Sequence, residues 1–196
     1  MRDTEGADYA ERLHRKQNAR WKKVLNVQAP YQWNLRRHDL GKTLDVGCGI
    51  GRNLPVLPPG SVGVDHNATS IEIARANGHT AYTTVEWETA PERQPGHFDG
   101  MLVSHVIEHM SPELGLEVMR SYLPYLRSGG KVLFICPQER GYASDPTHVR
   151  WTTGDDLVQL ARDLGLEPDE PRSFPFPRWT GKAFIYNEFN VLARKP

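Results

Sequence analysis

Two stretches of the chain carry side chains that together could hold a metal ion or move a proton. His105, Glu108 and His109 stand at positions i, i+3 and i+4, so one helical turn would place them on one face. Asp145 and His148 follow later, in the loop after a predicted strand. Imidazole and carboxylate groups bind divalent cations. This pattern predicts a metal site of Glu108, His109 and His148, with His105 as fourth ligand or general base and Asp145 as alternative ligand.

A second interpretation of these histidines stays open, in which they shape a pocket without any metal. In both interpretations the four residues expected to be catalytic are His105, Glu108, His109 and His148. An imidazole near its ordinary pKa can accept a proton at neutral pH, and a bound Mg²⁺ or similar ion lowers the pKa of a hydroxyl.

A glycine-rich loop is the second chemical feature. The stretch LDVGCGIG at residues 44–51 predicts a short buried strand over 43–46, a turn, and a helix start at 50–52. Glycine tolerates positive φ and lets a ligand approach the backbone closely. The unpaired N–H groups of a helix N-terminus favour a polar or anionic ligand group. The loop therefore predicts a cofactor that contains adenosine.

The spacing of the loop favours S-adenosylmethionine over a dinucleotide. The dinucleotide fingerprint is G-x-G-x-x-G, whereas Gly47, Gly49 and Gly51 bring the third glycine one residue early. Asp45 would repel a pyrophosphate but would favour a cationic cofactor. Asp65, at the end of the next strand, is expected to accept hydrogen bonds from the ribose hydroxyls of either cofactor. An NAD-dependent oxidoreductase is thus the weaker alternative.

Strands and helices alternate along the chain, which predicts an α/β fold with a mostly parallel sheet and helices on both faces. Ligands bind such sheets at the carboxyl ends of the strands. The expected strands are 43–46, 61–65, 80–83, 98–104, 131–136 and an antiparallel pair at about 167–176 and 183–193. The expected helices are 69–77, 112–126 and 153–164, preceded by an amphipathic helix over 5–28 and a short one near 31–35.

The 196 residues fit a single domain, in which 1–38 form either a helical lid or a helix packed on the sheet. Lys+Arg and Asp+Glu are both 24, and a formal charge of zero makes a nucleic-acid partner unexpected. Cys48 and Cys136 form no CxxC pair, and neither a secretory signal nor a membrane-spanning run is present, so a cytoplasmic location is expected. Trp179 and Tyr186 predict either a sugar-stacking platform or a homodimer surface.

Four motifs in order, LDVGCGIGRN, VGVDHN, FDGMLVSHVIEHM and LRSGGKVLFICP, resemble those of class I S-adenosylmethionine-dependent methyltransferases over about residues 40–165. The resemblance implies a Rossmann-like seven-stranded sheet of order 3-2-1-4-5-7-6 with strand 7 antiparallel. It also implies a set of residues that line the cofactor: Asp45, Gly47, Cys48, Gly49, Asp65, His66, Glu86, Trp87 and Ser104. Glu86 and Trp87 would flank the adenine, with core packing as the alternative role of Trp87.

The acceptor is suggested by two further segments. The VIEH segment with a later histidine resembles methyltransferases that act on the 3′-terminal ribose of small silencing RNAs, where a metal binds the vicinal hydroxyls. The segment DPTHVRW resembles bacterial methyltransferases of sugars and polysaccharides. His105 stands where the RNA enzymes have an acid.

The favoured hypothesis is therefore metal-assisted O-methylation of a sugar or polysaccharide hydroxyl, including the methylated polysaccharides of actinobacteria. Alternatives are a small metabolite, a lipid, the terminal ribose of an RNA, and a relative that binds the cofactor without catalysis.

Overall fold

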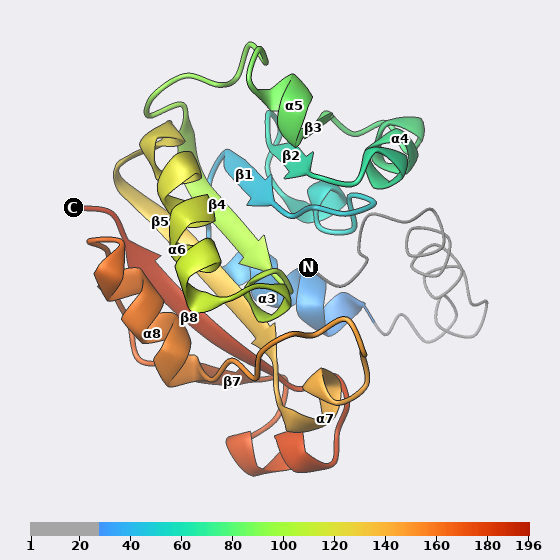
Figure 1. Cartoon of the computed structure of the whole chain (residues 1–196), viewed down its shortest axis with the longest axis vertical. Coiled ribbons are helices and arrows are strands. Elements are labelled where there is room, and N and C mark those ends of the chain that lie inside the picture. Colours follow the sequence, from blue (N-terminus) through green and yellow to red (C-terminus); the bar gives the residue numbers. More distant parts are fainter. Residues whose placement is uncertain (1–27) are drawn as a thin grey trace.

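The computed structural model describes residues 28–196, which fold around one open sheet (Figure 1). The strand order within these residues is β3-β2-β1-β4-β5-β8-β6, and β7 also pairs with β8. Strands β1 to β5 pair in parallel, whereas β8 runs antiparallel to its neighbours. The strands are β1 (Thr43–Val46), β2 (Val62–Asp65), β3 (Ala81–Thr83), β4 (Phe98–Ser104), β5 (Leu126–Pro137), β6 (Glu167–Pro168), β7 (Arg172–Phe174) and β8 (Glu188–Arg194).

The predicted fold class is confirmed, and the strand order differs from the prediction in one detail. The first strand of the predicted C-terminal pair, 167–176, is two short strands, β6 and β7, that follow one another along β8. The bend between them contains Pro171, which lacks the N–H that a continuous ladder needs. The second strand of the pair begins only at Glu188, because residues 183–187 form turns that continue from a 3₁₀ helix, η4 (Arg178–Lys182).

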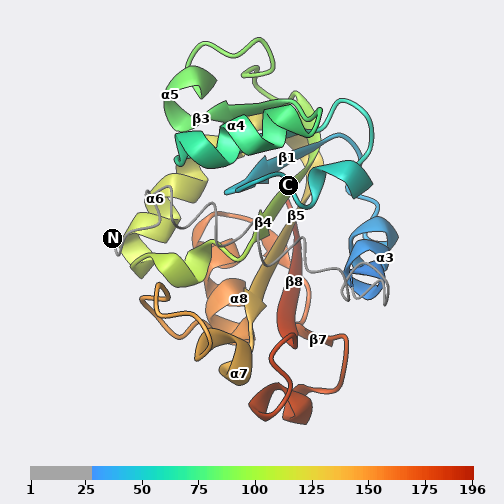
Figure 2. The same cartoon turned by 90° about the vertical axis from the view of Figure 1, so that its right-hand side faces the viewer.

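Helices cover both faces of the sheet, and Figure 2 shows α3 and α8 on opposite sides of β5 and β8. Side chains alternate between the faces along each strand. In β5, Val132 and Phe134 pack in the core under α6 and α8, while Leu133 and Ile135 pack with Leu35 of α3. The helices are α3 (Ala29–Arg37), α4 (Ala68–Ala76), α5 (Thr84–Trp87), α6 (Pro112–Tyr122), α7 (Glu139–Tyr142) and α8 (Gly154–Asp163).

Side-chain caps define where two of the helices start. The Thr153 hydroxyl accepts the N–H of Asp156, whose carboxylate accepts the N–H of Thr153 in return, so α8 opens with a capping box. The side chain of Asn67 accepts the N–H of Ser70 and caps α4 in the same way. These caps fix where the helices leave the strand ends, and therefore where the connecting loops can present functional groups.

Helix α3 is the described part of the predicted lid over 1–38. Its buried side holds Asn34, whose amide donates to Asn190 of β8, and its Tyr31 hydroxyl donates to the carbonyl of Tyr186. Trp33 points outward and is 56 % exposed. The helix is thus anchored on β8, while the predicted helix over 5–28, apart from its last residue, lies outside the described residues. Within residues 28–196, no helix has the length and apolarity needed to cross a membrane.

Candidate active site

The predicted functional residues gather at the edge where the parallel strands end. The glycine loop follows β1 and folds onto β2, because the N–H groups of Gly47 and Cys48 both donate to the carbonyl of Val64. The N–H of Gly49 donates to the Asp65 carboxylate at 2.8 Å. This carboxylate ends β2, so the loop and the second strand form one rigid unit at the edge.

Asp45 is buried inside this unit with 1 % of its surface exposed. Burial raises the pKa of its carboxyl to about 8, a hydrogen bond from Asn53 opposes the rise, and the charge of Asp65 adds to it. Among the described residues the Oδ2 atom has no hydrogen-bond partner. Buried polar atoms are nearly always paired, so this oxygen is suited to accept a hydrogen bond from a ligand, most favourably a cationic one.

The glycines of the loop differ in what surrounds them. Gly47 has φ +74°, and a Cβ at this position would collide with a methyl group of the Val106 side chain. In the sequence Val106 stands between His105 and Glu108, two residues of the predicted metal site. Gly49 has φ +53°, but apart from its chain neighbours no atom of residues 28–196 lies within 4 Å of a Cβ built there, which leaves room for a ligand against its backbone. The Cys48 side chain packs in the core with Leu54 and Ile71, so only its backbone faces the edge.

These surroundings predict different effects for two alanine substitutions. We expect Gly47→Ala to destabilise the fold by about 2 kcal/mol or more, because backbone strain and the collision with Val106 add. Gly49→Ala adds only strain, of about 1 kcal/mol, but its methyl group enters the open space. Thermal unfolding and titration with S-adenosylhomocysteine check this: Gly49→Ala must bind more weakly while remaining folded. Equal stability losses in both variants would contradict the assignment.

The residues expected around an adenine have other contacts. Trp87 is 2 % exposed and its indole packs against the rings of Tyr122 and Tyr125 in the core. This placement corrects the expectation that its ring flanks an adenine, because no face of the indole is open. Glu86 forms a bidentate pair with Arg75 and closes the capping box of α5. His66 lies at the end of β2 with its Nδ1 3.4 Å from Asp65.

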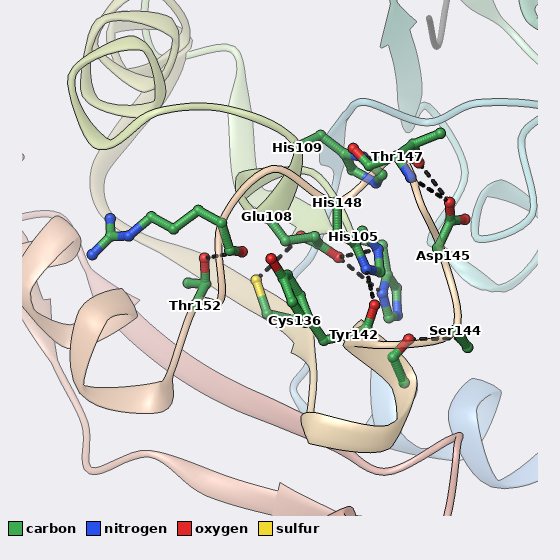
Figure 3. A network of polar contacts seen from close by, with 12 residues as sticks. His105, Glu108, His109, Cys136, Tyr142, Ser144, Asp145, Thr147, His148 and Thr152 are labelled. Carbon is green, nitrogen blue, oxygen red and sulfur yellow. Dashed lines mark hydrogen bonds and ion pairs between the residues drawn. The ribbon is translucent and has the colours of Figure 1, made fainter. Parts of the chain in front are cut away.

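Glu108, His109 and His148 converge at the same edge (Figure 3). One possible ligand atom from each residue lies within 4.8 Å of the other two. Glu108 and His109 stand in a 3₁₀ turn, η2 (Ile107–His109), after β4. His148 comes from the loop after α7, which is held against η2 because the N–H groups of Val149 and Arg150 donate to the Glu108 carbonyl.

Both histidines of this trio are held by their Nδ1 atoms. Nδ1 of His148 lies 2.7 Å from the carbonyl oxygen of Tyr142, and Nδ1 of His109 lies 3.2 Å from that of Thr147. A carbonyl only accepts, so each Nδ1 carries a hydrogen, which leaves Nε2 as the atom of each ring that can bind a metal. Burial lowers the pKa of His109, which favours the neutral form. A backbone carbonyl on the far nitrogen is the usual setting of a metal-binding histidine.

Glu108 is fully buried, yet its carboxylate stays ionised. Burial would raise its pKa, but the hydrogen bond and charge of His105 outweigh burial and lower the pKa. Oε2 accepts the thiol of Cys136 at 3.3 Å, and Oε1 faces Nε2 of His148 at 4.0 Å. The trio of Glu108, His109 and His148 therefore combines one carboxylate and two imidazoles whose possible ligand atoms lie close together.

His105 and Asp145 are placed differently from the other candidates. Both ring nitrogens of His105 are occupied, Nδ1 by Glu108 at 3.2 Å and Nε2 by Glu188 at 2.9 Å. Desolvation would lower the pKa of His105, but the contacts with the two carboxylates outweigh it and raise the pKa, while 43 % of the side chain stays exposed. The ring is thus neither a free ligand nor a free base. Asp145 accepts the N–H and hydroxyl of Thr147 and shapes the loop before His148.

Ser104, the last residue of β4, is half-buried at the same edge, next to β5.

Three residues of the site carried no assignment from the sequence: Asn53, Cys136 and Glu188. Asn53 stands two residues after Gly51 and Cys136 is the last residue of the predicted strand 131–136, so their positions were available as a signal. Glu188 required the register of β8 against β5, which pairs it with Pro137.

Comparison with known proteins identifies the family of the chain. A family model described as a methyltransferase domain matches residues 12–170. A search of curated proteins found no match.

Solved structures with the same fold include two S-adenosylmethionine-dependent methyltransferases. The one from Archaeoglobus fulgidus has 18 % sequence identity and a TM-score of 0.67, and the match covers 89 % of this chain and 97 % of that one. The one from Thermotoga maritima has 17 % sequence identity and a TM-score of 0.67, and the match covers 96 % of this chain and 99 % of that one. Magnesium protoporphyrin IX methyltransferase from Synechocystis, solved with S-adenosylhomocysteine, is also similar (14 %, 0.60, 92 % and 86 %). Because the family model covers most of the sequence, the chain belongs to the methyltransferase-domain family and is an S-adenosylmethionine-dependent methyltransferase of the class I fold.

Proposed function

We propose that the enzyme methylates a hydroxyl of a sugar or polysaccharide with the help of a divalent cation bound by Glu108, His109 and His148. The observation that carries the proposal is the convergence of these three side chains beside the cofactor loop. The two features are in contact, since Val106 of the segment that leads into η2 fills the space next to Gly47. A metal-bound hydroxyl would thus lie close to the transferred methyl group.

The residues of the loop fit the methyl donor. S-adenosylmethionine, when bound, supplies an electrophilic methyl group on a sulfonium. Asp45 offers a buried carboxyl oxygen without a partner to the ammonium of the methionine moiety, and Gly49 offers open space at its backbone. Asp65, already oriented by the N–H groups of Gly49 and Asn67, keeps lone pairs for ribose hydroxyls. In this proposal Cys48 contacts the cofactor only through its backbone and His66 lies at the border of the cofactor site. Trp87 has no contact with the cofactor.

The donor set also indicates the kind of metal. Mg²⁺ is bound almost entirely through oxygen, whereas imidazole suits first-row transition ions. Two imidazoles and one carboxylate therefore favour an ion such as Fe²⁺, Co²⁺, Zn²⁺ or Mn²⁺ over the Mg²⁺ suggested by the sequence. Such an ion, when bound, would lower the pKa of a coordinated hydroxyl and fix its orientation. Glu108 would supply the negative charge, and the carbonyls of Tyr142 and Thr147 would fix the imidazoles.

A sugar is favoured as acceptor because vicinal hydroxyls can chelate a cation held by only three protein ligands. The terminal ribose of an RNA offers the same pair of hydroxyls and is the second candidate. The formal charge of zero argues against RNA, whose affinity for proteins depends on Lys and Arg contacts to phosphate. Metabolites and lipids with a single hydroxyl lack this chelating pair.

Radiolabelled S-adenosylmethionine with a panel of acceptors tests the proposal. We expect label in an oligosaccharide with vicinal hydroxyls, and less in an RNA, a lipid or a small metabolite. EDTA is expected to lower turnover by about 100-fold or more, because the metal contributes several kcal/mol to the barrier. Added Co²⁺ or Mn²⁺ should restore turnover better than Mg²⁺. Undiminished turnover in EDTA would exclude the metal role, and label in RNA alone would exclude the sugar acceptor.

A further inference from the structure

Glu188 lies outside the trio, but its side chain reaches the site. It is the first residue of β8 and stands opposite Pro137, the last residue of β5. Its backbone is fixed by this pairing and by the side-chain amide of Gln138, which donates to the Glu188 carbonyl at 3.0 Å. The carboxylate is 12 % exposed and accepts a hydrogen bond from Nε2 of His105 at 2.9 Å.

His105 connects Glu188 to the trio. Its other nitrogen, Nδ1, lies 3.2 Å from Oε1 of Glu108, so one imidazole bridges two carboxylates. The backbone of His105 has φ +58°, a conformation that non-glycine residues adopt only when their surroundings enforce it. Its N–H donates to the carbonyl of Ile135 at 2.9 Å. The ring is therefore held at both nitrogens and from its backbone.

Glu108 depends on such support. Its carboxylate is fully buried, and its two oxygens have different partners: Cys136 contacts Oε2, while Oε1 faces His105 on one side and His148 on the other. Without His105, rotation of the carboxylate would turn Oε1 away from the imidazoles. Residues that hydrogen-bond to metal ligands and fix their orientation change metal affinity by about 10- to 100-fold.

We propose that Glu188 is a positioning residue of the metal site, which acts through His105 to aim Oε1 of Glu108 at His109 and His148. The inference rests on the proposed metal site and adds a residue from a different strand to it. It also gives His105 a role other than ligand or base. Its ring connects Glu188 of β8 to Glu108 of η2, so that the position of Glu188 determines the orientation of the Glu108 carboxylate.

Titration of the metal-free protein with Co²⁺, followed by its visible absorption, tests the proposal without any acceptor. We expect Glu188→Ala to weaken Co²⁺ binding by about 10-fold or more. Glu188→Gln keeps an acceptor for Nε2–H and is expected to recover part of the affinity. The matched control is Asp99→Ala, which removes a carboxylate paired with Arg127 at 2.7 Å near the start of β4, at the opposite end of this strand from η2, and should bind Co²⁺ like the unmodified protein.

A double-mutant cycle separates positioning from a general structural effect. His105→Asn removes the bridge, and asparagine tolerates the positive φ at this position. If Glu188 acts through His105, Glu188→Gln has no further effect on Co²⁺ affinity in the His105→Asn background. An unchanged affinity in Glu188→Ala, or an equal loss in both backgrounds, would overturn the positioning role alone. Absence of Co²⁺ binding by the unmodified protein would overturn both this role and the proposed metal site.

Discussion

His148→Ala is expected to abolish methyl transfer while the protein stays folded and still binds S-adenosylhomocysteine. The substitution removes one of two imidazoles whose Nε2 atoms can bind a metal, and it also removes the contact of Nδ1 with the Tyr142 carbonyl. Loss of a direct ligand should exceed the 10- to 100-fold effect of an indirect one, so we expect Co²⁺ affinity and turnover to fall by more than about 100-fold. The glycine loop, which binds the cofactor, does not depend on this ring.

The control for His148→Ala is His97→Ala, which removes an imidazole that contacts Lys42 and the ring of Phe98. Its Co²⁺ affinity and turnover should equal those of the unmodified protein. Glu108→Gln and His109→Ala are expected to show the same loss as His148→Ala, without further loss on combination, because the three ligands act as one unit. A His148→Ala protein with normal turnover would contradict the metal site, and one with lost cofactor binding would make His148 a structural residue.

Asp45→Asn is expected to stabilise the ligand-free protein at neutral and alkaline pH and at the same time to weaken cofactor binding. Burial raises the pKa of Asp45 to about 8 in the folded state, against an ordinary value of about 3.9 in the unfolded chain. Between these values the folded protein holds a proton that the unfolded chain releases. The stability contributed by this proton is therefore complete below about pH 4, falls by about 1.4 kcal/mol per pH unit, and is lost above about pH 8.

Asparagine has no such dependence, so Asp45→Asn should exceed the unmodified protein by about 3 kcal/mol or more at pH 8. Its neutral amide cannot pair with an ammonium, and affinity for S-adenosylhomocysteine should fall by about 10-fold or more. Denaturant unfolding at pH 5 and pH 8, with calorimetric titration of the ligand, measures both effects. A variant that is no more stable at pH 8 and binds the ligand normally would show that Asp45 is not the buried cation partner.

Most of the fold followed from the sequence because strand, turn and helix signals agreed along the chain, but the helix expected to start at 50–52 is only a 3₁₀ turn, η1 (Leu54–Val56). Glycines at 47, 49 and 51 marked the turn after β1, and all three adopt positive φ. The trio Glu108, His109 and His148 was the leading metal hypothesis, and the structure brings these residues together. Their proximity was predictable because β4 and β5 are parallel neighbours, so the segments that follow them begin at one edge.

The placement of His105 was not predictable, because it depends on one backbone angle. Spacing i, i+3, i+4 puts His105, Glu108 and His109 on one face only if a helical turn spans all three. The turn starts at Ile107, and His105, with its positive φ, places its ring between Glu108 and Glu188. Glu188 could not be identified from the sequence, because its contact follows from the antiparallel register of β8 and from the late start of that strand.

Trp87 shows the other limit of sequence reasoning. Aromatic residues near a ligand site and aromatic residues in the core have the same local signature, and only tertiary packing separates them. Trp87 lies within a group of rings that includes Tyr82 and Phe98. Similarly, the sequence placed Cys48 at the cofactor loop but could not show that its thiol points into the core under α4.

The most direct test of metal-assisted methyl transfer is a crystal structure of the protein with S-adenosylhomocysteine and Co²⁺, with diffraction recorded at the cobalt absorption edge. We expect one strong anomalous peak, from a cobalt ion within bonding distance of Nε2 of His109, Nε2 of His148 and a carboxylate oxygen of Glu108. This peak should lie beside the sulfur of the cofactor product. His105 should remain between Glu108 and Glu188. A cofactor bound in the glycine loop with no anomalous peak at this trio, at saturating Co²⁺, would contradict the metal-assisted mechanism.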